Sequence, residues 1–321
     1  MSGPPEETPA DVNPYQSPVV APAELPAGQP GAIPWGQKPF PGIGGAILLV
    51  LLITALQCAG GVGVAIVTGA VQALEIPLEP SDVMGLGMAA VQFMAFVPAI
   101  VLGCVLARRP AREVLPLGSF PFLVLVPMVV AAVGLVILVS ECDNLTRSVL
   151  PMPDELAEMF RDLFEGGVGT FVALVIVAPL VEELLFRGVI LGGFLARYRR
   201  GTAIGASAVL FAVAHLNPYQ FAAGLVTGVF LGWLLVRTRS LWPCILVHAA
   251  FNAHVVLVPV LRDQLGVEIP GFTAPPEAAV VEFQPAWFNA LGLVLAAAGT
   301  LGVAALTARP RAAPEGGPAG A

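Results

Sequence analysis

Apolar residues run in long blocks along this chain, separated by clusters of charged residues or by proline and glycine. A helix of about 20 apolar residues crosses a hydrocarbon core about 30 Å thick. Membrane β-strands would instead alternate apolar and polar residues over short stretches, and the chain lacks that alternation. The pattern therefore predicts an all-α fold, a polytopic membrane helical bundle with about eight transmembrane helices. The predicted spans are residues 43–70, 84–107, 119–140, 168–196, 202–219, 221–236, 241–261 and 286–307.

Two stretches add detail to this pattern. The spans 202–219 and 221–236 are short and are separated only by Asn217-Pro218-Tyr219, so we expect a tight helical hairpin. Residues 154–165 place apolar side chains at helical spacing among charged ones. This predicts an amphipathic helix at the bundle surface or membrane interface, which Gly166-Gly167 would end.

The overall composition agrees with a membrane protein and excludes other classes. Hydrophobic residues make up 57% of the chain, charged residues 12%, and the mean hydropathy is +0.85. The net charge of −7 argues against a nucleic acid partner, which needs a basic patch. The four cysteines are scattered, which favours neither a disulfide framework nor a cysteine metal cage.

Basic residues between the spans predict the orientation. With both termini cytoplasmic, the loops and tails on that side carry eleven Lys and Arg residues, and the opposite side carries three. Because membrane proteins concentrate basic residues in cytoplasmic loops, we expect a multi-pass protein of the cell membrane with both termini cytoplasmic. The eleven residues are Lys38, Arg108, Arg109, Arg112, Arg197, Arg199, Arg200, Arg237, Arg239, Arg309 and Arg311; the three are Arg147, Arg161 and Arg262.

The same division predicts the organisation of the chain. The first forty residues are rich in proline and poor in large apolar side chains, which is typical of a disordered tail. The expected segments are a cytoplasmic tail (1–41), helices one to three (42–140), an extracytoplasmic loop with the amphipathic helix (141–167), a catalytic transmembrane core (168–262), a loop with the last helix (263–307) and a cytoplasmic tail (308–321).

Three charged residues lie within the fourth predicted span. A charge in the bilayer centre costs roughly 2.5 to 3.5 kcal/mol on insertion scales, so these residues mark a functional site by default. Glu183 and Arg187 are four residues apart, in the favourable order for an ion pair on one helical face. Glu182 lies about 100° around the helix from Glu183 and remains the unpaired carboxylate.

Two histidines and an asparagine are expected at a similar depth. His248 and Asn252 are four residues apart and share one helical face, and His215 lies in another predicted span, 202–219. Counting about 1.5 Å per residue places them with Glu182 in a layer between the midplane and the cytoplasmic face. His254 points off the face of Asn252 and is left out of the expected site.

This set of side chains suits hydrolysis. Glu182 can take a proton from water, a histidine can orient that water or protonate the leaving amine, and Asn252 can donate to an oxyanion. We favour this mechanism, which requires no cofactor; the alternative is catalytic zinc held by Glu182, His215 and His248. A purely structural interpretation is also open, with interhelical hydrogen bonds and a packing ion pair.

The motifs Glu-Glu-Leu-Leu-Phe-Arg (182–187), Phe211-Ala-Val-Ala-His215 and His248-Ala-Ala-Phe-Asn252 resemble the three signatures of the CAAX protease and bacteriocin-processing family. The resemblance covers about residues 170–256, including a similar loop at 237–243. It implies an intramembrane endopeptidase of the type II CAAX prenyl endopeptidase fold, in which Glu182 activates water, His215 and His248 assist and Asn252 stabilises the oxyanion. Glu183 and Arg187 would shape the site, and Phe211 would pack beneath it.

Two other classes of function remain open at this stage. One is a proton-coupled carrier, although the first half of the chain lacks a second copy of these motifs. The other is a non-catalytic scaffold or immunity protein that uses the same pocket for binding. The partners expected for the endopeptidase are a peptide or membrane-protein substrate and the lipid bilayer.

Overall fold

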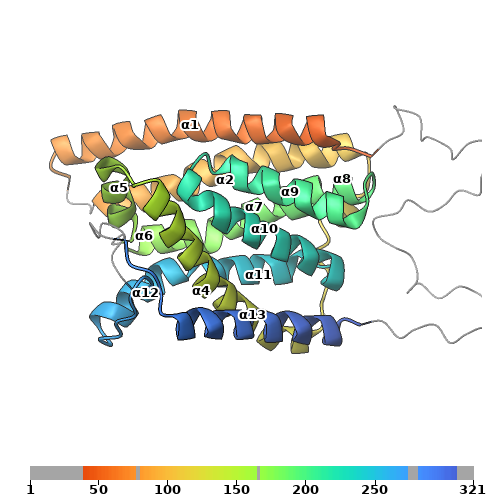
Figure 1. Cartoon of the computed structure of the whole chain (residues 1–321). Helices are drawn as coiled ribbons and strands as arrows, with labels where there is room; N and C mark the ends of the chain where they lie inside the picture. The colour runs from red at the N-terminus through yellow and green to blue at the C-terminus, as the bar shows by residue number, and fades with distance from the viewer. Residues whose placement is uncertain (1–38, 77–79, 165–166, 274–280, 309–321) are drawn as a thin grey trace, which may run out of the picture.

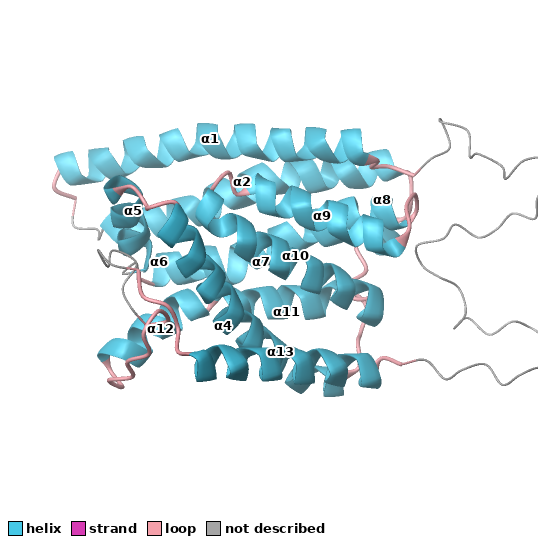
Figure 2. Ribbon diagram, viewed as in Figure 1, coloured by secondary structure: helices cyan, strands magenta, loops and turns pink. Residues whose placement is uncertain are grey.

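The computed structural model describes residues 39–76, 80–164, 167–273 and 281–308, which form helices and connecting loops without a β-strand (Figure 2). Most of the proline-rich tail expected at 1–41, most of the tail expected at 308–321 and Gly166 lie outside the described residues. The elements are α1 Ile43–Ala73, α2 Pro80–Ala107, α3 Ala111–Val114, η3 Phe122–Val124, α4 Leu125–Val149, α5 Asp154–Phe164, α6 Val168–Phe171, η4 Val172–Val177, α7 Ala178–Glu183, η5 Leu184–Leu191, α8 Gly192–Leu195, α9 Arg200–Ala214, α10 Pro218–Thr238, α11 Leu241–Asn252, α12 His254–Asp263 and α13 Ala286–Leu306.

The expected all-α polytopic bundle is confirmed. Seven helical segments among the described residues are long and apolar enough to cross a membrane, and α9 is a shorter apolar helix. The start of α1 and the end of α13 lie at the same end of the bundle (Figure 1), so the chain crosses an even number of times. Counting α9 as the partner of α10 gives eight crossings, and the chain is a multi-pass membrane protein.

The helical hairpin of α9 and α10 is present, but its turn differs from the predicted one. Asn217-Pro218-Tyr219 does not separate the two helices, because α10 already begins at Pro218. The Asn217 side chain caps α10 by accepting a hydrogen bond from the Tyr219 amide at 3.0 Å. Proline suits the first helical position because its missing N–H is not needed there.

Two spans that the sequence predicts as single helices are interrupted. The segment Val168–Leu195 alternates α-helical and π-helical stretches, with the π-helical turns at η4 and η5. The span predicted at 241–261 divides at Ala253 into α11 and α12. The amphipathic helix is observed as α5. Helix α4 continues to Val149, past the end predicted at residue 140, and the other long spans are close to their predicted bounds.

Helices α4 and α13 pack with their backbones almost touching. A Cβ atom on Gly134 would lie 2.2 Å from the Ala296 nitrogen, and one on Gly299 would lie 2.3 Å from the Ala131 nitrogen. Lipid chains are as apolar as leucine, so membrane helices gain from close contact through small residues. Helix α13 lies on the side of the bundle opposite α1, and α4 crosses the bundle obliquely (Figure 1).

The end of the bundle where α1 begins is held by loop contacts and is rich in arginine. The loop before η3 accepts hydrogen bonds from the start of α11, with Leu241 N bonded to Pro116 O at 2.8 Å and Ser240 Oγ to Gly118 O at 2.6 Å. These contacts fix the position of α11, which carries part of the candidate site. The connections at this end contain Arg108, Arg109, Arg112, Arg197, Arg199, Arg200, Arg237 and Arg239.

Candidate active site

The short helix α7 places two adjacent glutamates between the π-helical stretches η4 and η5. A π-helical turn inserts an extra residue into the α-helical spiral, and such turns often occur at functional sites. Glu182 and Glu183 still project about 100° apart, as in any α-helix. The two carboxylates consequently enter different surroundings.

Glu183 lies in a buried ion-pair network, in which its Oε2 has no hydrogen-bond partner among the described residues. Its side chain is 0% exposed, and its Oε1 accepts a hydrogen bond from Arg187 Nη1 at 2.7 Å. The Arg187 guanidinium is 1% exposed and also lies over the ring of Phe211, 4.3 Å from the centroid. The pairing that the four-residue spacing predicts is confirmed by this geometry.

His248 connects the two glutamates. Its Nδ1 donates to Glu183 Oε1 at 2.8 Å, because a carboxylate can only accept. Its Nε2 lies 4.0 Å from Glu182 Oε2. The imidazole on α11 is therefore oriented by the buried Glu183 and presents its other nitrogen to Glu182.

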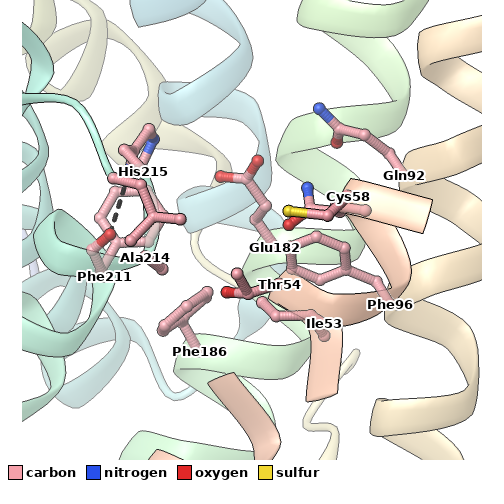
Figure 3. A pocket seen from close by; sticks show the side chains of 12 residues that line it. Ile53, Thr54, Cys58, Gln92, Phe96, Glu182, Phe186, Phe211, Ala214 and His215 are labelled. Atoms are coloured by element: carbon pink, nitrogen blue, oxygen red, sulfur yellow. Dashed lines mark hydrogen bonds between the residues drawn. The ribbon is translucent and has the colours of Figure 1, made fainter. Parts of the chain in front are cut away.

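Glu182 and His215 share a cavity of about 350 Å³ (Figure 3). The Glu182 side chain retains 12% exposure, in contrast to its neighbour. His215 follows the end of α9, and its Nδ1 donates to the Phe211 carbonyl at 2.9 Å. This leaves His215 Nε2 as the nitrogen able to exchange protons or accept hydrogen bonds in the cavity.

Phe211 packs between the parts of the site. Its ring meets the rings of His215 and His248 edge to face, with centroids 5.0 Å and 5.7 Å away. Phe186 contacts it from η5 in the same manner at 5.1 Å. The expected position of Phe211 beneath the polar residues agrees with these contacts.

Asn252 lies apart from the cavity lining. Its Nδ2 donates to the Leu174 carbonyl in η4 at 2.9 Å, so the amide is engaged with the backbone. It remains on the same helix as His248, one turn away. His254, which was left out of the expected site, is on α12 and does not line the cavity either.

The zinc alternative can be compared with this geometry. In the described part of the chain, no three or more His, Cys, Asp or Glu side chains form a group that could hold a metal ion. His215 and His248 each use Nδ1 to bind another protein group. Both rings keep Nε2 available, as zinc-bound histidines commonly do when Nδ1 binds a neighbouring group, so zinc held by Glu182, His215 and His248 stays a prediction and we derive no step through it.

The cavity has a second wall that the sequence analysis did not assign. Thr54, Gln57 and Cys58 of α1 and Gln92 of α2 face it, together with apolar side chains of the same helices (Figure 3). The available sequence signal was Gln92, which is the single amide side chain in the apolar stretch of α2. Only the packing of α1 and α2 against α7 and α9 reveals which polar residues meet Glu182.

Glu182 lies closer to the middle of its helical segment than the sequence predicts. It lies near the middle of the segment Val168–Leu195, about 20 Å from either end at about 1.5 Å per residue. The sequence count placed it nearer the end that carries the arginines. Because the helical segment extends beyond a 30 Å core, its depth relative to lipid stays a prediction.

Comparisons with known proteins agree with the motif assignment. Residues 165–254 match the model of a family described as type II CAAX prenyl endopeptidase Rce1-like, which confirms the expected resemblance over this segment. Over 83 residues the chain is 29% identical to the Bacillus subtilis (strain 168) protein named "Putative membrane peptidase YdiL". That match covers 26% of this chain and 34% of the relative, or about a third of its length. No solved structure matches the chain.

Proposed function

We propose that this chain, whose residues 165–254 match the type II CAAX prenyl endopeptidase family model, is an intramembrane endopeptidase. The observation that carries the proposal is the different fate of two adjacent carboxylates. The Glu183 carboxylate is bound by Arg187 and His248, whereas Glu182 faces a cavity that His215 also lines. A free carboxylate beside an imidazole in a membrane cavity suits activation of water.

In the proposed reaction, Glu182 removes a proton from a water molecule as the oxygen attacks the carbonyl carbon of the peptide bond. The carbon–nitrogen bond then breaks, and the proton passes from Glu182 to the leaving amine. His215 orients the water through Nε2, since its Nδ1 is fixed on the Phe211 carbonyl. The products are a carboxylic acid and an amine, which exchange a proton to become a carboxylate and an ammonium, and no covalent enzyme intermediate forms.

His248, Glu183 and Arg187 support this step. His248 Nε2 lies 4.0 Å from Glu182 Oε2 and borders the carboxylate. Glu183 holds the His248 ring through Nδ1, and Arg187 pairs with Glu183. Asn252, which the resemblance assigns to the oxyanion, would take this role by exchanging the Leu174 carbonyl for the substrate.

Cleavage is proposed on the cytoplasmic side of the bilayer midplane, with both termini in the cytoplasm and without a required cofactor. The arginine-rich loops at the end where α1 begins support this orientation. The family description suggests a peptide with a prenylated cysteine as the first substrate to test. An otherwise identical peptide without the prenyl group separates recognition of the lipid from recognition of the peptide.

The test is cleavage of these two internally quenched peptides by the purified protein in lipid nanodiscs. We expect Glu182→Gln to lower the cleavage rate at least about 100-fold, because the general base is lost. The matched control is Glu158→Gln on the exposed face of α5, which should cleave like the wild type.

Equal cleavage by Glu182→Gln and the wild type would overturn the proposal. If neither peptide is cut by any variant, the peptide termini in membrane extracts are compared between cells that carry the wild type and cells that carry Glu182→Gln. These extracts contain many more candidate substrates. The absence of any peptide terminus that depends on Glu182 would then favour a non-catalytic binding protein.

A further inference from the structure

The cavity is lined by residues inside the segment that matches the family model and by residues outside it. Glu182, Phe186, Phe211 and His215 belong to the segment that matches the family model. The opposite wall comes from α1 and α2, which lie outside that segment. Any selectivity specific to this chain can therefore reside in the second wall.

Gln92 is the most informative residue of that wall. It lies in the middle of α2, surrounded in sequence by apolar residues, where a polar side chain is costly unless it is hydrogen-bonded. Its Oε1 atom is buried and has no hydrogen-bond partner among the residues that the structure describes. The protein thus maintains an amide in an apolar helix without using its acceptor internally.

Figure 3 shows where this amide points. The amide end of Gln92 extends toward the side of the cavity that contains Glu182, and Cys58 and Phe96 line the same cavity. Thr54 and Gln57, one turn apart on α1, line the same cavity. The result is a polar strip beside the proposed catalytic carboxylate, bordered by apolar rings.

A peptide backbone matches this strip chemically. A primary amide offers an acceptor and two donors. In the observed conformation the Gln92 acceptor is buried, so its N–H groups would donate to a peptide carbonyl, and rotation of the side chain would bring the acceptor to a peptide N–H. The amide that the family resemblance assigns to substrate contact, Asn252, donates instead to Leu174 O. The amides that face the cavity are those of Gln57 and Gln92.

We propose that Gln92 binds the main chain of the peptide substrate and positions the bond to be cleaved against Glu182. Thr54 and Gln57 extend this contact along α1, while Ile53 and Phe96 accept apolar side chains of the substrate. The inference rests on the proposed endopeptidase function. It adds a substrate-positioning residue from outside the matched segment.

The experiment measures kcat and KM of Gln92→Leu with the internally quenched prenylated and unmodified peptides in nanodiscs. Leucine keeps the side-chain size but removes the hydrogen bonds, so KM should rise about tenfold with little change in kcat. The matched control is Gln72→Leu at the far end of α1, where the side chain is exposed and distant from the cavity lining. An unchanged KM in a folded Gln92→Leu protein overturns the proposal and assigns Gln92 to water binding.

A second measurement does not depend on catalysis. A photoreactive benzoylphenylalanine replaces Gln92 or Gln72 in the Glu182→Gln background, and the unmodified peptide is added before irradiation. We expect a crosslink at position 92 and none at 72; crosslinking at neither position contradicts the inference. If the wild-type protein cleaves no peptide, the proposed function is rejected. A crosslink at position 92 would still show that the peptide binds there.

Discussion

At the scale of residues, neighbouring glutamates illustrate how burial divides one motif into two roles. Glu183 is fully buried and has Arg187 and His248 as partners, whereas Glu182 stays partly exposed in the cavity. An isolated buried charge is costly, so Glu183 depends on both of its partners. Glu183 therefore contributes to packing through its ion pair, and the adjacent Glu182 stays accessible in the cavity.

Replacing Arg187 tests this dependence. Arg187→Met leaves the Glu183 carboxylate buried with His248 as its remaining hydrogen-bond partner, so we expect a loss of about 3 to 5 kcal/mol in stability. The measurement is thermal unfolding in detergent. Glu183→Gln combined with Arg187→Met should recover part of that loss, because the unpaired charge is removed. Simple additivity of the two substitutions would show that the ion pair contributes little.

Cys58 reports on access of water to the cavity. Its side chain is exposed and lines the cavity beside Glu182. Thiols react as thiolates, which form in water rather than in hydrocarbon. A water-soluble methanethiosulfonate reagent should therefore modify Cys58 and lower peptide cleavage several-fold, as measured with the quenched peptides. A Cys58→Ser protein should keep its activity, and inhibition of that variant to the same extent would place the reactive thiol elsewhere.

The sequence predicts much of this residue-level geometry because spacing within one helix determines which side chains share a face. Glu183 and Arg187 are an example, and their pairing is observed. Gln92 could not be assigned, since its position beside Glu182 depends on how two helices far apart in sequence pack. The contact of Asn252 with Leu174 O has the same origin.

At the scale of elements, the bundle combines tight and loose helix pairs. Helices α4 and α13 approach closely through glycine, whereas several glycines of α1, including Gly61, have nothing within 4 Å of an added Cβ. The same residue type therefore serves packing in one helix and faces open space in another. This contrast gives a matched pair of substitutions.

Gly134→Ala should destabilise the protein by about 1 to 3 kcal/mol, because its Cβ would lie 2.2 Å from the Ala296 nitrogen and force the helices apart. Gly61→Ala should be neutral or stabilising by up to about 1 kcal/mol, since alanine favours helix and finds free space. Thermal unfolding of both variants under identical conditions measures the difference. Equal effects would contradict the close approach of α4 and α13.

Element positions follow from apolar run length, but their internal breaks do not. The π-helical turns η4 and η5 lie on either side of α7, and the apolar run length does not predict them. Pro179, in the first turn of α7, is a local signal for a break after η4, because proline has no backbone N–H to donate. The cap formed by Asn217 and Pro218 was readable in principle, as asparagine before proline is typical of a helix start.

At the scale of the whole molecule, the arrangement of helices and arginines predicts the topology. The described ends of the chain share the end with the arginine-rich loops, and Arg147 and Arg262 lie toward the other. Green fluorescent protein fused after residue 308 should fluoresce, because it folds in the cytoplasm, and a fusion inserted at residue 266 should stay dark. Alkaline phosphatase fusions at the same sites should give the opposite pattern. Reversed signals at both sites would invert the proposed orientation.

The length of α1 has a consequence for the environment in which the protein works. Its 31 residues measure about 46 Å, well beyond a hydrocarbon core of about 30 Å, and it forms one wall of the cavity while most of its surface faces outward. A helix longer than the bilayer adapts by tilting, so the acyl-chain length of the lipids can set the angle of this wall. Membrane thickness would then act on the shape of the cavity as a physical effector without occupying any binding site.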